Sequence, residues 1–324
     1  VGADFDAVVA QVAQRLGARP APIQLPLGSE DKHEGVIDLV RLKAYRFERD
    51  GSGKGKEVPI PPELATDAAE ARTRLVEAVA EADEHLLEKF FEEGTLEAAD
   101  LEAGLKTAIA SRKIFPVTVG SSLHLVGCST LLDFLIDFAP SPAEHPYPAR
   151  TIDGKTQMLE ADPAKPVVAI VFKTLNDPFT GRLSILRVIS GTLQNDAQLW
   201  NVRAEEAEKT HGLVHLQGKQ GTATPRLIAG DIGGVPKLRL ALSGDTLAAK
   251  EQALAADWIQ IQEPAMSFAV EPKSKGDDEK IGDALHRLIE EDPSLRAGRD
   301  PQTHEFLLSG SGQLHVEIAL ARMK

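Results

Sequence analysis

The fold is decided by the stretch Pro166-Val-Val-Ala-Ile-Val-Phe-Lys-Thr-Leu-Asn-Asp-Pro-Phe-Thr-Gly-Arg-Leu-Ser-Ile-Leu-Arg-Val-Ile-Ser-Gly191. Val167 to Phe172 is a short apolar run rich in β-branched residues, which predicts a strand buried on both faces. Pro178 and Gly181 supply turn chemistry, because proline fixes φ and glycine permits a positive φ. Leu183 to Ile189 predicts a second strand, again apolar on both faces, as expected in a sheet that closes on itself. On this pattern alone, an ordinary hairpin in any β domain is the alternative.

Strand patterns continue beyond this hairpin. Short apolar runs at 213–216, 226–232 and 237–243 are separated by glycine and aspartate, which terminate strands. Several short strands of this kind predict a small β-barrel over residues 166–260. The preceding residues 141–165 are rich in proline and predict a stiff, extended linker between two domains.

The last part of the chain, residues 264–324, predicts a ferredoxin-like unit. Its apolar patterns follow the order strand, helix, strand, strand, helix, at 266–270, 277–291, 295–299, 305–308 and after Gly312. This order is typical of a split βαβ unit. The unit needs one more strand, so we expect the domain to be truncated at Lys324, before that strand.

The first part of the chain, residues 1–140, predicts an α/β domain. Asp4 is a helix cap, an apolar face at helical spacing runs from Phe5 to Leu16, and Gly17 ends the helix. Two strands are expected to follow, at 35–40 and 44–48.

A strand, a serine-rich turn and a helix end this domain. The apolar run Phe115 to Gly120 predicts a buried strand, followed by the turn Ser121-Ser122-Leu123. Residues 128–138 predict a helix whose inward face is formed by Leu131, Leu132, Leu135 and Phe138. In α/β folds a ligand binds beyond the carboxyl end of such a strand.

Residues 63–110 form an acidic helical region. They contain thirteen Asp and Glu against four Arg and Lys, a net charge of −9 within a total of −13. Apolar residues recur at helical spacing from Ala68 to Phe90, and a second helix is expected at about 98–111. Two interpretations stay open: a solvated helical hairpin, or a docking surface for a basic or helical partner.

Composition limits the classes of function. With 324 residues and a net charge of −13, the chain cannot bind nucleic acid through bulk charge, so any RNA contact must use local patches. The single cysteine, Cys128, excludes an internal disulfide and a cysteine-based metal cluster. A reducing cytosol is the expected compartment. No apolar stretch reaches the length of a membrane span, and the histidines lack metal-ligand spacing, so we expect no metal site.

Several motifs resemble bacterial elongation factor G, a translational GTPase. Motifs similar to the start and later parts of its second domain are Asp177-Pro-Phe-Thr-Gly-Arg-Leu183, Arg187-Val-Ile-Ser-Gly191, Ala229-Gly-Asp-Ile232 and Gly244-Asp-Thr-Leu247. Motifs similar to its third domain are Val270-Glu-Pro-Lys273, Glu291-Asp-Pro-Ser294 and Gly312-Gln-Leu-His-Val-Glu-Ile318. The resemblance keeps the family's order along the chain.

The resemblance implies a multidomain fold with α/β, β and α+β parts. Residues 1–140 would be the C-terminal part of a P-loop GTPase domain, with an acidic α/β insert at about 36–113. A proline-rich linker (141–165), a translation-factor β-barrel (166–260) and a ferredoxin-like βαββα domain III (264–324) would follow.

The resemblance also implies roles for particular residues. Ser121, Ser122 and Leu123 would bind guanine, mainly through backbone N–H groups. Ser294 and His315 would lie where domain III faces the GTPase domain, on a surface coupled to nucleotide state and to fusidic acid binding. Candidates for contact with small-subunit ribosomal RNA are Lys173, Arg182 and Arg187, and the alternative is that they are solvated barrel residues.

The implied function is ribosome-dependent GTP hydrolysis that promotes translocation of tRNA and mRNA during protein synthesis in the cytoplasm. Partners would be small-subunit ribosomal RNA and the ribosomal stalk protein, the latter through the acidic helices at about 63–112. We expect a monomer with no membrane partner. GTP or GDP with Mg²⁺ would be the cofactor of the full-length parent. The sequence lacks the phosphate loop and both switch regions that phosphoryl transfer needs, so we name no catalytic residue and expect no tight nucleotide binding by this chain.

Two other functions stay open. One is a related ribosomal GTPase, such as peptide-release factor three or a ribosome-protection factor; the other is a non-enzymatic acidic ribosome-binding module. Gln313 stands where the family usually has Glu, and Ser121-Ser122 stands where it usually has Ser-Ala. These departures indicate a divergent paralogue, whose translocation activity the resemblance does not assure.

Overall fold

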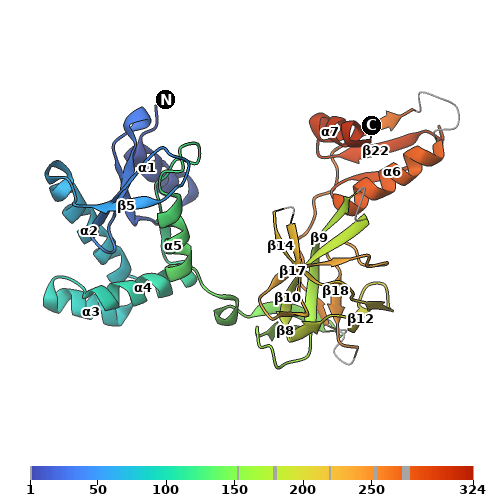
Figure 1. Cartoon of the computed structure of the whole chain (residues 1–324), viewed down its shortest axis with the longest axis horizontal. Helices are drawn as coiled ribbons and strands as arrows, with labels where there is room; N and C mark the ends of the chain where they lie inside the picture. Colours follow the sequence, from blue (N-terminus) through green and yellow to red (C-terminus); the bar gives the residue numbers. More distant parts are fainter. Residues whose placement is uncertain are drawn as a thin grey trace. The chain divides into compact units, whose positions relative to one another are not determined.

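The computed structural model describes residues 2–151, 153–177, 181–218, 220–250, 254–271 and 278–323, in two units (Figure 1). Unit 1 is Val1–Pro140 and unit 2 is Ser141–Lys324. Residues 178–180 and 272–273 of the quoted motifs, and Asp277 of the predicted helix, lie outside the described residues.

Unit 1 begins with the predicted helix α1, Phe5–Leu16. Asp4 caps it by accepting the Ala7 N–H at 3.0 Å, and Gly17 ends it with a φ of 60°. A four-stranded antiparallel sheet has the order β2-β3-β4-β5, formed by Gln24–Leu27, Gly35–Asp38, Lys43–Phe47 and Gly55–Val58. A parallel pair joins β1, Pro20–Pro22, to β6, Phe115–Val117.

The acidic region forms three helices where the sequence predicted two. These are α2, Ala65–Ala80; α3, Glu84–Glu93; and α4, Ala98–Ala110. The chain breaks after α2 because Asp83 accepts the N–H groups of His85 and Leu86 and so caps a new helix. The predicted apolar stripe is confirmed in the core of unit 1 by Ala68, Ala71, Leu75, Val79, Ala82 and Leu86.

Helix α5, Cys128–Phe138, forms as predicted, but most of its predicted inward face is not buried. Phe138 is buried, whereas Leu131, Leu132 and Leu135 are 40%, 61% and 48% exposed. Strand β6 is not buried either: Phe115 is 45% exposed, and within the described chain β6 pairs only with β1. Apolar patterns in the sequence located these elements, but they carried no information on what covers them.

Unit 2 is built around the predicted hairpin. Strand β9, Val168–Asp177, pairs with β10, Gly181–Ser190, and the register shifts at two places. The pair lies at the centre of an eight-stranded antiparallel sheet, in the order β13-β12-β18-β9-β10-β17-β14-β15. The other six strands are β12 Gln198–Asn201, β13 Glu206–Lys209, β14 Val214–Gln217, β15 Gln220–Ala223, β17 Ile232–Pro236 and β18 Thr246–Ala248.

Strand β9 buries both faces over residues 168–171, within the run predicted to do so. Ala169 and Val171 lie in one apolar core, and Val168 and Ile170 lie in another. The second core includes a small sheet in the order β19-β7-β8, formed by Leu254–Ala256, Tyr147–Thr151 and Thr156–Leu159. The predicted linker 141–165 therefore contains a hairpin that packs on the main sheet. Strands β11, Thr192–Gln194, and β16, Arg226–Ile228, form a further pair.

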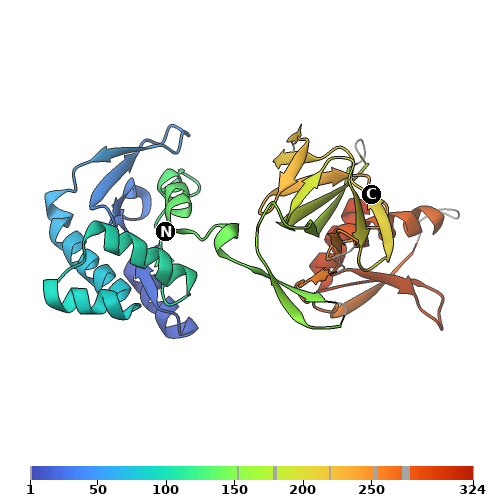
Figure 2. The ribbon, with the colours of Figure 1, turned by 90° about the horizontal axis from the view of Figure 1, so that it is seen from below.

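The end of unit 2 has the predicted order of strand, helix, strand, strand, helix (Figures 1 and 2). The elements are β20 Met266–Val270, α6 Asp278–Glu291, β21 Arg296–Arg299, β22 Phe306–Gly310 and α7 Gln313–Met323. The sheet has the order β20-β22-β21, and Leu308 on its central strand packs with Leu285 and Leu288 of α6 and Val316 of α7. Nowhere in the described ranges is there a helix whose length and apolar character would let it cross a membrane.

Candidate functional site

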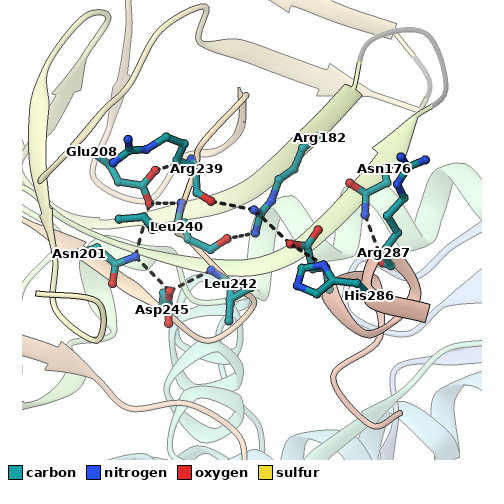
Figure 3. Close-up of polar contacts among 12 residues, drawn as sticks. Asn176, Arg182, Asn201, Glu208, Arg239, Leu240, Leu242, Asp245, His286 and Arg287 are labelled. Carbon is teal, nitrogen blue, oxygen red and sulfur yellow. Dashed lines mark hydrogen bonds and ion pairs between the residues drawn. The ribbon is translucent and has the colours of Figure 1, made fainter. Parts of the chain in front are cut away.

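The β9–β10 hairpin is bonded to the last turn of α6. Lys173 Nζ donates to the carbonyl of Glu291 at 2.7 Å, a group at the helix end with no intrahelical donor. The backbone N–H of Asn176 donates to Glu291 Oε1 at 2.6 Å. The side-chain amide of Asn176 donates to the carbonyl of Arg287 at 3.2 Å (Figure 3). These bonds join the strand-rich part of unit 2 (166–260), called here the strand domain, to the ferredoxin-like domain (264–324). We call this contact the joint.

Arg182 of β10 is the second link in the joint. Its Nη1 donates to the carbonyl of Arg239 at 3.1 Å, and its Nη2 donates to the carbonyl of Ala241 (Figure 3). Nη1 also lies 3.3 Å from Glu290 Oε1, and the two side chains are only 16% and 14% exposed. An ion pair so far removed from water is screened little by salt. Arg182 thus links both the loop at 237–243 and helix α6 to strand β10.

Glu291 is the buried carboxylate at the centre of the joint. Its side chain is 7% exposed. One oxygen accepts a hydrogen bond from the Asn176 N–H, and the other accepts one from Nη2 of Arg322 on α7. A buried charge is stable only when it is paired and hydrogen-bonded, and Glu291 is both. The hairpin, α6 and α7 therefore meet at one side chain.

Two buried carboxylates hold the loop that Arg182 binds. Glu208 accepts the N–H groups of Arg239 and Leu240 at 2.6 and 3.2 Å, and Asp245 accepts that of Leu242 at 2.9 Å (Figure 3). The prediction of a strand at 237–243 is therefore wrong, and the segment is a loop. These three N–H groups donate to carboxylates and not to the carbonyl groups of a neighbouring strand.

A second cluster follows directly on the joint, around Asp292. Asp292 Oδ1 accepts the N–H and the hydroxyl of Ser294 at 3.0 and 2.5 Å. Oδ2 lies 3.0 Å from Nε2 of His315, and Nδ1 of His315 accepts the N–H of Ser311 at 3.2 Å. This bond to Nδ1 places the imidazole proton on Nε2, facing Asp292. The predicted pair Ser294 and His315 is thus brought together through Asp292.

The hydrogen bonds of this cluster suit a structural role for His315 rather than a role as a catalytic base. The Ser311 hydroxyl lies 3.0 Å from His315 Nδ1, which has the connectivity of a nucleophile and its base. However, the Ser311 N–H already occupies that lone pair, so His315 is not available to take the hydroxyl proton. Burial acts to raise the pKa of Asp292, but hydrogen bonds from Ser294 and His315 outweigh it and hold this pKa below its usual value.

The lowered pKa of Asp292 predicts acid-sensitive stability. Because the folded-state pKa lies below the unfolded one, the stabilisation is present above about pH 4 and is lost as pH falls through the folded value. Asp292→Asn is expected to cost about 1 kcal/mol at pH 7. The cost should shrink below about pH 4, as measured by urea unfolding at several pH values. The exposed Asp283→Asn on α6 is the control, and a cost that does not depend on pH would contradict this account.

The three cations predicted to contact RNA lie in different settings. Lys173 and Arg182 are half-buried and bonded within the joint. Arg187 is half-buried on β10 and lies close enough to Tyr147 to act on it electrostatically. Contact of these residues with RNA stays a prediction, and for Lys173 and Arg182 the structure offers a role in joining domains.

The predicted guanine-binding turn lies in unit 1, between β6 and α5. Ser121 and Val126 exchange backbone hydrogen bonds of 2.9 and 3.0 Å and close the turn. The Ser121 N–H is therefore engaged, whereas the N–H groups of Ser122 and Leu123 make no hydrogen bond to any described residue. Leu123 is 85% exposed. Two free N–H groups on an open turn fit a planar carbonyl acceptor.

Gly127 fixes the shape of this turn. Its φ is 78°, and a Cβ there would lie 2.4 Å from the Val119 carbonyl oxygen. Gly127→Ala is expected to destabilise unit 1 by about 2 kcal/mol, through strain and a clash with backbone. Differential scanning calorimetry measures the cost. Gly94→Ala, with φ of 71° and open space around it, is the control for conformational strain alone, and an equal cost for both would exclude the clash.

Several residues of the site carried no sequence signal of their own. Asn176 lies in the stretch Pro166–Gly191, and Glu291 and Asp292 lie in the motif Glu291–Ser294. No spacing rule indicated that Asn176 and Glu291 would meet across 115 positions, or that Asp292 and Ser311 would both contact His315. Within the described parts of the chain, no group of three or more His, Cys, Asp or Glu is placed to hold a metal ion.

Comparison with known proteins agrees with this architecture. Residues 166–250 match the family described as elongation factor G domain 2, and residues 261–324 match elongation factor G, domain III. A crystal structure of a protein from Thermus thermophilus is similar to the chain, with a TM-score of 0.83 and 31% sequence identity. The match covers 99% of this chain and 46% of that one, so the chain spans less than half the length of this relative.

Proposed function

Because this is an elongation factor G-like chain, carrying domains II and III of that family, we propose that it forms part of a ribosome-dependent GTPase. Its activity would be promotion of tRNA and mRNA translocation in the cytoplasm. The observation that carries the proposal is the joint, where one buried carboxylate, Glu291, links the barrel hairpin to both helices of the ferredoxin-like domain. The two domains would then move together when nucleotide state changes.

Unit 1 would contribute part of the nucleotide site. The free N–H groups of Ser122 and Leu123 would bind a guanine carbonyl, and Gly127 would keep them in place. GTP with Mg²⁺ would supply the phosphoryl group and its charge stabilisation when bound. The acidic helices α2 to α4, with Phe91 77% exposed on α3, would meet the ribosomal stalk protein. Arg187 remains a candidate for contact with small-subunit RNA.

The experiment is GTP turnover by the full-length protein, with and without ribosomes. We expect strong stimulation by ribosomes, and its absence would reject the proposal. A translocation assay run beside peptidyl-tRNA release and drug-rescue assays separates this function from the related ribosomal GTPases. Binding of labelled GDP to the 324-residue chain is expected to be undetectable, because the sequence lacks a phosphate loop; tight binding would place the nucleotide site elsewhere.

A further inference from the structure

The joint contains a cavity that the proposed function does not use. It has a volume of about 560 Å³, within the usual range of small-ligand sites. The hairpin contributes Asn176 and Arg182 to its lining, and α6 contributes Arg287 and Leu288. Helix α7 contributes Arg322. Three elements from two domains thus line one space.

The charge of this cavity is opposite to that of the chain. Its lining holds three arginines and one glutamate, whereas the whole sequence has 49 acidic and 36 basic residues. Glu291 is neutralised by Arg322, and Arg182 is neutralised by Glu290 just outside the lining. One net positive charge therefore remains, on Arg287. In the described part of the chain the Arg287 guanidinium has no carboxylate partner.

Two of the arginines that line the cavity have accessible donors. Arg287 is exposed, and its side chain lies beside that of Asn176 (Figure 3). Arg322 remains 54% exposed although it is paired with Glu291, so it keeps N–H groups free for a second acceptor. Arginine binds phosphate through two parallel hydrogen bonds, and a phosphate held by two arginines is a strong charge-assisted contact.

The cavity also has apolar lining residues. Ala284 and Leu288 of α6 and Met323 of α7 line it. Such a surface suits a ring, and methionine adapts to aromatic groups with little specificity. A volume of this size, one net positive charge and three apolar lining residues fit a small molecule with a single phosphate and a planar ring.

We propose that this cavity binds a phosphate-bearing small molecule of mononucleotide size, with Arg287 and Arg322 holding the phosphate. Ala284, Leu288 and Met323 contact the ring, and Asn176 offers its amide oxygen to a ring donor. The ligand bridges α6 and α7 next to Glu291, so its binding tightens the joint. The site is independent of GTP and of the ribosome.

The test is isothermal titration calorimetry of the 324-residue chain with adenosine 5′-monophosphate, adenosine and inorganic phosphate. We expect measurable binding of the monophosphate that weakens as salt rises, and much weaker binding of adenosine and of phosphate alone. Arg287→Gln should weaken monophosphate binding by about tenfold or more. The matched control is Arg226→Gln, an exposed arginine on β16, which should leave binding unchanged.

Three outcomes would overturn the proposal. They are no monophosphate binding at millimolar concentration, equal binding by Arg287→Gln, and equal binding of adenosine. A fourth is preference for RNA: a short oligoadenylate that binds far more tightly than the monophosphate, and loses affinity with Arg287→Gln, would make the cavity an RNA contact. Because no arm contains GTP or ribosomes, failure here leaves the proposed GTPase function untouched.

Discussion

Asp245→Ala is expected to destabilise the strand domain by about 4 kcal/mol. Asp245 is 4% exposed and accepts two hydrogen bonds from Arg203, at 2.6 and 2.9 Å. It also accepts the Asn201 amide at 3.1 Å and the Leu242 N–H at 2.9 Å. Alanine would leave the fully buried Asn201 amide short of an acceptor. The loop that binds Arg182 would then keep its bonds to Glu208 but lose its bond to Asp245.

Tryptophan fluorescence during urea unfolding measures this effect. Both tryptophans of the chain, Trp200 and Trp258, lie in unit 2, so the signal reports on that unit. Asp283→Ala, at an exposed position of α6, should change stability by less than about 0.5 kcal/mol. A cost below about 1 kcal/mol for Asp245→Ala would mean that the buried network does not support the loop.

Glu291→Gln is expected to weaken the joint by about 3 kcal/mol. Glutamine keeps the shape but turns one acceptor into a donor, which then faces either the Asn176 N–H or Arg322. The strand domain and the ferredoxin-like domain should therefore unfold in two steps in calorimetry. Backbone hydrogen exchange should become faster at the end of α6 and near Asn176 in β9.

The matched control for this substitution is Glu317→Gln on α7. Glu317 is exposed and accepts one hydrogen bond from Gln313 on the same helix, at 2.7 Å. The same chemical change there should have little effect, because exposed pairs contribute little. If both substitutions cost the same, Glu291 does not hold the domains together.

Local patterns were sufficient for most elements of the fold. The apolar run at 167–172 predicted a strand with both faces buried, and β9 has them. The capping of α1 by Asp4 and the order of the ferredoxin-like unit also followed from sequence. The β-barrel and ferredoxin-like folds are confirmed by the family matches at 166–250 and 261–324. Assignment of residues 1–140 to a GTPase domain stays a prediction.

The errors have a common physical origin. Leu131 and Leu135 have helical spacing in the sequence, yet their exposure depends on which surfaces surround α5. Residues 237–243 have strand composition, but Glu208 and Asp245 take their N–H groups. The candidate site could not be predicted from the sequence for the same reason. Glu291 meets Asn176 through tertiary packing, which no local window of sequence contains.

Glu291 and Asp292 are neighbours in sequence, yet one holds the barrel hairpin and Arg322 while the other holds Ser294 and His315. Successive residues of a helix are turned by about 100°. A one-residue insertion or deletion late in α6 would swing each carboxylate away from its partners and disconnect both contacts together. Relatives that share this arrangement should therefore vary freely in loop lengths elsewhere but keep a fixed number of residues between the α6 core leucines and this acidic pair.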